Sequence, residues 1–288
     1  MVKLSIIILS YNTKKVTREC LKSLFKNLKN INDFKTEIIV VDNGSKDGSV
    51  EMLEGYKVRK LIKLIKNEKN EGFAKANNRG LRKAKGEYIL FLNSDVMVNE
   101  IRFGKLINYL ERNLEVGAVT VEVRLPTGEI DPASHRGFPT PWNSFCYFSN
   151  LEKFFGKLPL IGRIFGGYHL TYLNRETVHE VDSITGAFFL TRRKLLEKLN
   201  GFDEDFFMYG EDIDLAFRIK KLGYKIIYYP LFQVTHLKYT SGLKKNNKET
   251  KKHFYKAMKI FYHKHYEKHY PWFFNKLIYL LIDFKSHF

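Results

Sequence analysis

The feature that most constrains the fold is a regular alternation of apolar runs and amphipathic segments over the first 120 residues. The apolar runs are short, continuous and rich in β-branched residues, which is typical of strands buried on both faces. We predict strands at 4–10, 36–42, 61–67 and 87–93, and helices at 14–29, 47–56 and 73–85. Continuous apolar strands joined by helices indicate an α/β protein with a doubly wound, mostly parallel sheet and a Rossmann-like half.

Polar residues directly follow each of these predicted strands. The groups lie at 10–12, 42–49, 67–78 and 93–96, and each contains Ser, Asn or Asp. Turns use the same residue types, so one such group alone would predict only a turn. Because parallel strands end at one edge of a sheet, and ligands bind at that edge, four groups together predict a ligand site.

The pattern becomes irregular after residue 120. The segment "VEVRLPTGEIDP" predicts a hairpin that turns at 126–128, and residues 132–180 are rich in aromatic residues, Gly and Pro without a clear period. So long an aperiodic stretch indicates a functional insertion or a flap. Further along, "VDSITGAFFLTRRKLLEKLNG" predicts a strand, a helix and a glycine stop. "YKIIYYP" and "FQVTHLKYTSG" predict two more short strands or turns.

The stretch "FFMYGEDIDLAFR", at 206–218, concentrates acid in a basic chain. Glu211, Asp212 and Asp214 fall within four positions, directly after an aromatic run. Acidic residues in a first helical turn interact favourably with the helix dipole, and this accounts for one or two of them. The helix dipole accounts less well for the third carboxylate and for the wall of aromatic residues before it.

The chain carries a net charge of +18, which suggests an anionic partner such as nucleic acid, nucleotide phosphates or an acidic membrane surface. A Lys-rich proteome adapted to high temperature is an alternative explanation. The two distant cysteines, Cys20 and Cys146, predict a reducing compartment without disulfides or a zinc site. The N-terminal apolar run lacks the features of a signal peptide, so we expect a cytoplasmic protein.

The end of the chain differs in composition. Residues 244–268 hold nine Lys and two Glu, a net charge of +7, with apolar residues at helical spacing. After Pro271, "WFFNKLIYLLIDF" is apolar nearly all round but too short to span a bilayer. We therefore divide the chain into a domain at 1–243, whose two halves meet near residue 120, and a basic helical tail at 244–288. The tail is expected to contact an anionic membrane surface, with packing on the domain or a dimer contact as the alternatives.

Six motifs stand in the order found in family 2 glycosyltransferases, and the chain resembles the rhamnosyltransferase-like branch. They are "SIIILSYN", "VVDNGSKDGS", "NEGFAKANNRG", "YILFLNSDV", "TGAFFLTRR" and "FDEDFFMYGEDIDLAFR", within roughly residues 3–240. The resemblance implies a GT-A fold, a nucleotide-sugar donor, a divalent cation (Mg²⁺ or Mn²⁺) and inversion at the anomeric carbon. It favours dTDP-rhamnose over UDP-sugars as donor. It implies a saccharide or lipid-linked acceptor in surface polysaccharide or glycoconjugate synthesis.

A sugar diphosphate needs a stabilised leaving group, and a cation held by a carboxylate and the phosphates supplies this as a Lewis acid. By resemblance, Asp95 is the metal-side carboxylate, and His236 matches a position where relatives often place a histidine ligand. Relatives often have two Asp flanking one residue, but here Asn93 takes the first place. We therefore expect the cation to bind mainly together with the donor. A hydrogen-bonded surface histidine is the alternative for His236.

The resemblance also implies which residues hold the donor. Asp42 would accept a hydrogen bond from the base imide or the ribose, and Gly72 would let the backbone approach closely. Core packing is the alternative for Phe73. The full implied set is Ser10, Tyr11, Asn12, Asp42, Asn43, Ser45, Asn70, Gly72, Phe73, Ala74, Asn77, Asn93, Ser94, Asp95 and Gly186.

An inverting transfer needs a general base that takes the acceptor proton on the face opposite the leaving group. Asp212 matches the base of the family, and Glu211 would position the acceptor or stiffen the turn. Asp214 is expected to cap the helix or to pair with Arg218. The aromatic wall before them consists of Phe206, Phe207 and Tyr209. Candidates for phosphate contact are Arg192, Arg193 and Arg218, with surface solvation as the favoured alternative for Arg192 and Arg193.

Three other classes of protein remain open as alternatives. A nucleic-acid binder would explain the charge, but no RNA or DNA motif is recognisable, so we expect no nucleic-acid partner. A nucleotidyltransferase would be expected to show a Gly-rich phosphate loop after the first strand, and "SYNTKK" has no Gly. A non-catalytic sugar-nucleotide-binding protein is disfavoured by the presence of both Asp95 and Asp212.

Overall fold

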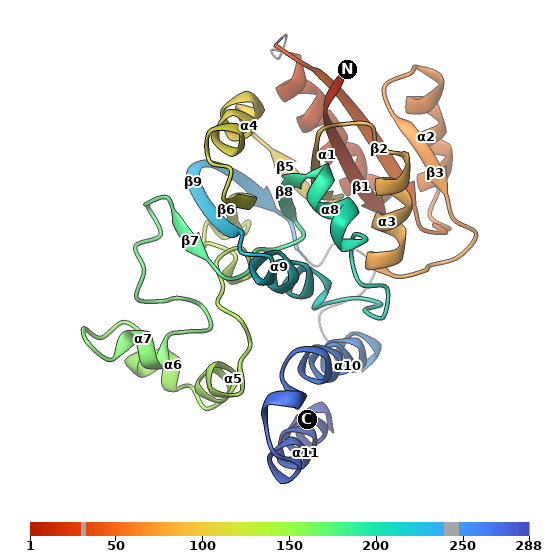
Figure 1. The fold of residues 1–288 in the computed structure, drawn as a ribbon. Coiled ribbons are helices and arrows are strands. Elements are labelled where there is room, and N and C mark those ends of the chain that lie inside the picture. Colours follow the sequence, from red (N-terminus) through yellow and green to blue (C-terminus); the bar gives the residue numbers. More distant parts are fainter. Residues whose placement is uncertain (30–32, 239–247, 288) are drawn as a thin grey trace.

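The computed structural model describes residues 1–29, 33–238 and 248–287. A nine-stranded sheet, built from these described residues, forms its centre (Figure 1). The strands adjoin in the order β3-β2-β1-β4-β8-β6-β9-β5, and β7 also pairs with β9. Their bounds are β1 Val2–Ser10, β2 Lys35–Asp42, β3 Lys63–Lys66, β4 Tyr88–Asn93, β5 Val96–Val98, β6 Val116–Arg124, β7 His179–Val181, β8 Phe188–Arg192 and β9 Lys225–His236.

The first half of the sheet is parallel, as predicted. β1 pairs in parallel with β2 on one side and with β4 on the other, and β2 pairs in parallel with β3. The register places Ser10 opposite Asp42, and Leu9 opposite Asn93. The polar groups that follow these strands therefore meet at one edge of the sheet.

The second half of the sheet is mixed. β8 runs antiparallel to β4 and β6, whereas β9 runs parallel to β6 and antiparallel to β5 and β7. The prediction of two short strands around Pro230 is wrong, because β9 is one strand of 12 residues. Its register with β6 shifts between Val121 and Glu122, which leaves Pro230 in an irregular part of the ladder. Proline is tolerated at such an irregularity because no ladder bond is needed from its nitrogen.

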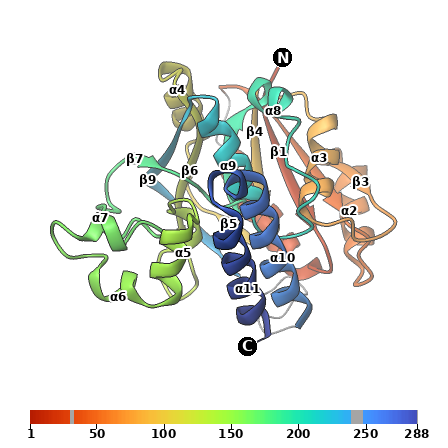
Figure 2. The same ribbon diagram turned by 60° about the horizontal axis from the view of Figure 1, so that its bottom comes forward.

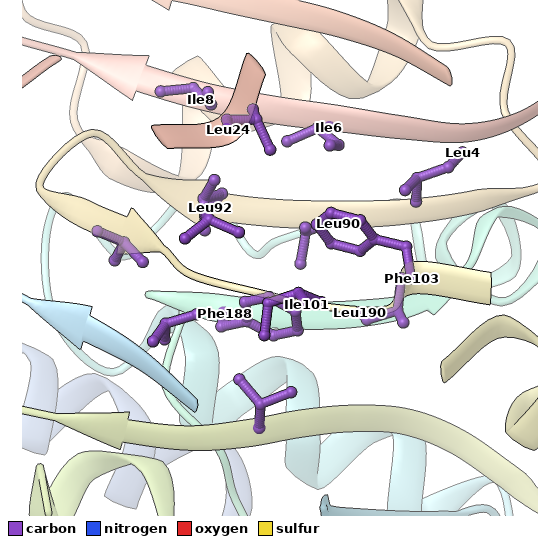
Figure 3. Close-up of a cluster of buried hydrophobic side chains, with 14 of the residues drawn as sticks. Leu4, Ile6, Ile8, Leu24, Leu90, Leu92, Ile101, Phe103, Phe188 and Leu190 are labelled. Carbon is purple, nitrogen blue, oxygen red and sulfur yellow. The ribbon is translucent and has the colours of Figure 1, made fainter. Parts of the chain in front are cut away.

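Helices cover both faces of the sheet. Side chains alternate along β1, so Ile6 and Ile8 face one layer and Ile7 faces the other. Figure 3 shows the first layer, in which Leu24 and Phe103 lie over strand residues such as Leu90. The first layer contains α1 (Lys14–Leu28), α2 (Ser49–Val58) and α4 (Phe103–Arg112), and the second contains α3 (Phe73–Lys83), α8 (Arg193–Leu199) and α9 (Glu211–Lys221).

The aperiodic stretch at 132–180 folds into short elements that are too brief to show a period. Thr140 caps α5 by accepting a hydrogen bond from the amide of Asn143, and Pro141 occupies the first helical position. In Figure 2, α5, α6 and α7 gather on the side of the sheet where β7 lies. The elements are η1 (Pro132–Ser134), α5 (Pro141–Phe148), α6 (Leu151–Phe155) and α7 (Gly162–Phe165).

The predicted tail forms two long helices that differ in packing. α10 (Lys248–His265) packs on the loop before α9, where Ala257 and Phe261 bury Phe206. α11 (Trp272–His287) follows η2 (Glu267–His269) and lies along α10 (Figures 1 and 2). Within the described ranges, no helix is both long and apolar enough to cross a membrane. The predicted boundary at 243/244 lies outside the described residues.

Candidate active site

The loops that follow β1 and β2 are joined by Asn12. Its backbone N–H donates to Ser45 Oγ at 2.9 Å, and its side-chain Oδ1 accepts from the Lys46 amide at 2.8 Å. Asn12 has a φ of 52°, in the left-handed region that Asn tolerates. Ser10 is buried beneath this junction, and Tyr11 is half-buried. The first two polar groups thus form one connected surface.

Asp42 is fully buried at the end of β2. Its Oδ1 accepts from the Ser45 amide at 2.9 Å. Its Oδ2 is also buried, and within the part of the chain that the structure describes it has no hydrogen-bond partner. An unsatisfied buried oxygen costs about 1–3 kcal/mol or more. Oδ2 therefore has an unused acceptor position, which a ligand donor such as a ring N–H or a ribose hydroxyl can fill only when the atoms that cover it shift.

A network of asparagines fixes the loop after β3. Asn43 Nδ2 donates to Asn70 Oδ1 at 2.8 Å, and Asn43 Oδ1 accepts from Asn67 Nδ2 at 2.9 Å. Asn70 Oδ1 also accepts from the Gly72 amide at 3.0 Å. Gly72 has a φ of 86°, and a Cβ there would lie 2.5 Å from the Phe207 carbonyl oxygen. Only glycine fits this close approach.

The start of α3 belongs to the packing beside this loop. The Phe73 ring meets Phe202 edge-on, with ring centroids 5.9 Å apart, and Ala74 is fully buried in the same core layer. Asn77 Nδ2 donates to the Phe73 carbonyl oxygen at 3.0 Å. The Phe73 amide donates to the Phe207 carbonyl oxygen at 2.6 Å, which ties the donor half to the loop before α9.

Asp95 and His236 meet at the same edge of the sheet. His236 Nε2 lies 3.2 Å from Asp95 Oδ1 and 3.5 Å from the side-chain Nδ2 of Asn93. On the other side of the ring, Nδ1 lies 3.1 Å from Asp131 Oδ2. His236 is only 6% exposed, so the surface-histidine alternative is wrong. Burial lowers the pKa of His236, but hydrogen bonds to Asp131 and Asp95 outweigh burial and raise it to about 9.

These side chains can supply part of a metal site. Within the described residues, no group of three or more His, Cys, Asp or Glu side chains is arranged to hold a metal ion. Asp95, His236 and Asn93 nevertheless bring one carboxylate, one imidazole and one amide together. Mg²⁺ usually keeps one or two protein carboxylates and takes its other ligands from water and substrate phosphates. Asp95 can therefore serve a divalent cation whose coordination is completed by a diphosphate, and His236 can join it once its Nε2 has lost the proton that faces Asp95.

The Asp212 carboxylate is held from three directions in the first turn of α9. Its Oδ2 accepts from the Gly186 amide at 3.1 Å and from Arg136 Nη2 at 3.0 Å. Its Oδ1 accepts from the Ile213 amide at 2.8 Å. The carboxylate is therefore oriented before any ligand binds.

One short backbone segment connects this carboxylate to the end of β4. The Gly186 amide contacts Asp212, and the carbonyl oxygen of the next residue, Ala187, accepts from the Asn93 amide at 3.2 Å. Asp95 follows Asn93 by two residues. The structure thus brings the predicted base and the predicted metal-side carboxylate to the same edge of the sheet.

Glu211 lies beside Asp212 and is 6% exposed. Burial and the neighbouring charge of Asp212 raise the pKa of Glu211 to about 8. Its Oε2 is buried and has no hydrogen-bond partner within the described ranges. At neutral pH, a carboxyl in these surroundings is mostly neutral and can donate a hydrogen bond.

Aromatic side chains before Glu211 pack on α10. The Phe207 ring stacks on His253 with centroids 4.6 Å apart, and Tyr209 meets Phe254 at 6.0 Å. Tyr209 and Gly210 have φ values of 70° and 79°, which turn the chain sharply into α9. The aromatic wall predicted from the sequence is therefore braced by a helix from the predicted tail.

The three arginines predicted to contact phosphate serve other roles, so that prediction is wrong. Arg218 pairs with Asp214 at 2.7 Å, which is the pairing predicted for Asp214. Arg218 also donates to backbone carbonyl oxygens. Arg192 lies beside Tyr88, at the opposite end of β4 from the site. Arg193 pairs with Glu197 on α8.

A family model described as "Glycosyl transferase family 2" matches residues 5–199, which is more than half of the chain. The chain belongs to this family. A second model, described as "N-terminal domain of galactosyltransferase", matches residues 169–241. The second match covers the part of the site that contains Asp212 and His236.

The curated relatives of this family 2 chain include enzymes of polysaccharide synthesis. It is 24% identical over 229 residues to the poly-beta-1,6-N-acetyl-D-glucosamine synthase of Staphylococcus epidermidis, covering 79% of this chain and 48% of that protein. It is 30% identical over 158 residues to rhamnosyltransferase WbbL of Escherichia coli, covering 54% of each chain. The chain spans about half the length of these relatives.

Solved structures confirm the predicted GT-A-like α/β fold with a C-terminal helical region. The crystal structure of Staphylococcus aureus TarS matches 90% of this chain and 39% of its own, with 20% identity and a TM-score of 0.58. The mannosyltransferase PcManGT from Pyrobaculum calidifontis, in complex with GDP-Man and Mn²⁺, matches 91% of this chain and 63% of its own. The identity is 20% and the TM-score 0.57.

Two polar contacts of this family 2 site were missed by sequence reasoning. Asp131 contacts Nδ1 of His236, on the side of the ring away from Asp95, and Arg136 contacts Asp212. The Asp-Pro pair at 131–132 is a signal for a local cap, and Asp131 does cap η1, but nothing in that pair indicates a histidine partner. Arg136 lies in the aperiodic stretch and carries no sequence signal.

Proposed function

We propose that the chain is an inverting, cation-dependent glycosyltransferase. It moves a sugar from a nucleotide-diphosphate donor to a saccharide or lipid-linked acceptor in the synthesis of surface polysaccharide or glycoconjugate. The observation that carries this proposal is the placement of Asp212 and Asp95 at one sheet edge, joined through Gly186, Ala187 and Asn93. A base and a leaving-group site must flank the same anomeric carbon, and placement at one sheet edge supports these roles for the two carboxylates.

One group of residues would hold the nucleoside of the donor, and another would hold its diphosphate. Asp42 Oδ2 is the buried acceptor for the base or ribose, and the loop fixed by Asn43 and Gly72 lies beside it. Asp95 and His236, with Asn93 nearby, would hold the cation and through it the diphosphate. When bound, a divalent cation supplies charge neutralisation for the leaving diphosphate.

The base side acts on the acceptor. Asp212 would take the proton of the acceptor hydroxyl as its oxygen attacks the anomeric carbon and the bond to the diphosphate breaks. Glu211, which is neutral at this buried position, would donate a hydrogen bond to the acceptor. Because the attack comes from the face opposite the leaving group, the configuration at the anomeric carbon is inverted.

The favoured donor is dTDP-rhamnose, supported by the 30% identity to the relative named rhamnosyltransferase WbbL. UDP-sugars are the alternative, supported by the complexes of TarS with UDP and UDP-GlcNAc. A hydrolysis screen of dTDP-rhamnose, UDP-GlcNAc and GDP-mannose, with and without Mn²⁺ or Mg²⁺, tests both points. We expect cation-dependent release of dTDP. Release of UDP or GDP instead would contradict dTDP-rhamnose as the donor. No release from any sugar nucleotide would contradict the proposed function.

We also propose that the chain contacts an anionic cytoplasmic membrane surface through α11. The six most outward apolar residues of this helix have exposed fractions of 50–76%. Residues 244–268 carry a net charge of +7, and each basic side chain near an anionic surface contributes about 1 kcal/mol. Such a surface complements both the charge and the apolar stripe. The six residues are Trp272, Phe273, Leu277, Leu280, Leu281 and Phe284.

The membrane contact predicts that flotation with anionic vesicles depends on the outer face of α11. A variant with Trp272→Ser, Leu280→Ser and Leu281→Ser should stay unbound at low salt, whereas the wild-type chain floats. Leu114→Ser is the matched control, because Leu114 is 72% exposed but lies before β6. Equal flotation of the wild-type chain and the triple variant, or no flotation of either, would contradict the membrane contact. A wild-type dimer in solution that the triple variant dissociates would instead make this face a subunit contact.

A further inference from the structure

Arg136 occupies a rigid and buried position in the loop between η1 and α5. Its carbonyl oxygen accepts from the amides of Ser183 and Asp182, at 2.8 and 3.1 Å, and its own amide donates to Ser183. Its side chain is 11% exposed and ends 3.0 Å from Asp212 Oδ2. A guanidinium is costly to bury without a partner. The paired backbone therefore serves to hold this cation against one carboxylate.

Asp212 has neighbouring carboxyl groups on its own helix and a guanidinium from another segment. Glu211 and Asp214 stand beside it on α9, while Arg136 and the uncharged phenol of Tyr168 approach from the inserted segment, and Asp131 also interacts with Arg136. Two adjacent buried carboxyls rarely both ionise, because like charges repel strongly away from water. Arg136 donates to Asp212, whereas the buried Glu211 Oε2 has no partner among the described side chains. The geometry is thus asymmetric between the two carboxyls.

We propose that Arg136 is a positioning residue that keeps the negative charge of the Glu211–Asp212 pair on Asp212 and leaves Glu211 neutral. It thereby decides which carboxyl acts as the base. This inference rests on the proposed function, in which Asp212 receives the acceptor proton. The proton passes from the acceptor hydroxyl to Asp212, and the electrons of the broken sugar–phosphate bond leave with the diphosphate.

The test compares pH profiles of transfer by Arg136→Gln, Arg136→Lys and the wild-type chain. A nearby opposite charge favours ionisation of a carboxyl by about 1–3 pH units. The base must be ionised to work, and loss of Arg136 makes ionisation harder. The acidic limb of the kcat/KM profile should therefore move upward by about 1–3 pH units in Arg136→Gln. The activity of Arg136→Gln at neutral pH should fall and should recover at alkaline pH, while its donor affinity should be unchanged. Arg136→Lys, which keeps a positive charge, should move the profile part of the way back toward that of the wild-type chain.

Lys220→Gln is the matched control, because Lys220 binds Asp182 and Glu180 nearby but does not contact Asp212. It should leave the pH profile in place. A uniform loss at every pH, or a rise confined to the acceptor KM, would overturn the inference. A double variant is a second measurement: Arg136→Gln should add almost nothing to the loss caused by Asp212→Asn, and additive losses would also overturn it. A wild-type chain that transfers no sugar would instead contradict the proposed function.

Discussion

Asp212→Asn is expected to abolish sugar transfer while leaving donor binding nearly unchanged. Asn keeps the size of Asp212 and an oxygen for the Gly186 amide, but it cannot take a proton from the acceptor. Loss of a general base typically costs about 10²–10⁴ in rate. Single-turnover transfer at saturating donor measures the rate, and calorimetric titration with the nucleotide diphosphate measures the binding.

Asp205→Asn provides a matched control for this variant. Asp205 lies on the loop before α9, but its side chain is 68% exposed and pairs with Lys264 rather than with Arg136. It should transfer at the wild-type rate. Transfer by Asp212→Asn at the wild-type rate would remove Asp212 from the role of base, and Glu211→Gln would then be tested as the next candidate.

Asp95→Ala is expected to weaken binding of the nucleotide diphosphate strongly and to remove most of the activity. Asp95 is the only carboxylate that the "NSDV" motif offers, since Asn93 takes the other place. Neutralisation of the diphosphate by a cation contributes several kcal/mol, so we expect a loss of about 10²-fold or more. Calorimetry with the nucleotide diphosphate in the presence of Mn²⁺ measures this loss. Glu129→Ala, which removes an exposed carboxylate between β6 and η1, is the control.

The same site predicts the order in which cation and donor bind. One carboxylate, one imidazole and one side-chain amide would hold a cation loosely, so tight binding should require the donor's phosphates. Mn²⁺ titrated into the free protein should give weak heats, and Mn²⁺ titrated into the protein with nucleotide diphosphate should give strong ones. Full activity in excess EDTA, after the stripped protein is checked for residual metal, would contradict the cation requirement.

The donor half of the fold could be predicted because its rules are local. Continuous apolar strands followed by polar groups specify a parallel sheet with a ligand edge, and Ser10, Asp42 and Asn93 lie at that edge. The position of Asp212 at the start of a helix was also readable, because the apolar residues after it repeat at helical spacing. In these places neighbouring residues in the sequence decide the structure.

The acceptor half could not be predicted to the same depth because its contacts join distant segments. Arg136 reaches Asp212 across 76 positions, and Asp131 reaches His236 across 105. Neither pair leaves a trace in periodicity. The sequence predicts one membrane-contacting tail, but its two described helices differ: α11 exposes a row of apolar residues, whereas α10 packs on the aromatic wall through residues such as Phe261. Its apolar spacing predicted a helix without saying what the helix would cover.

The short segment Gly186–Ala187 has a mechanical consequence. Because it contacts both Asp212 and Asn93, and continues into β8 between β4 and β6, the proposed base and the proposed leaving-group site are both tied to one continuous sheet. They cannot separate by a hinge as two lobes do around a ligand. We therefore expect the spacing between the proposed base and the leaving group to stay fixed when the donor binds. A donor sugar with a bulkier substituent would have to fit that gap as it stands, and its size limit would be set by backbone geometry.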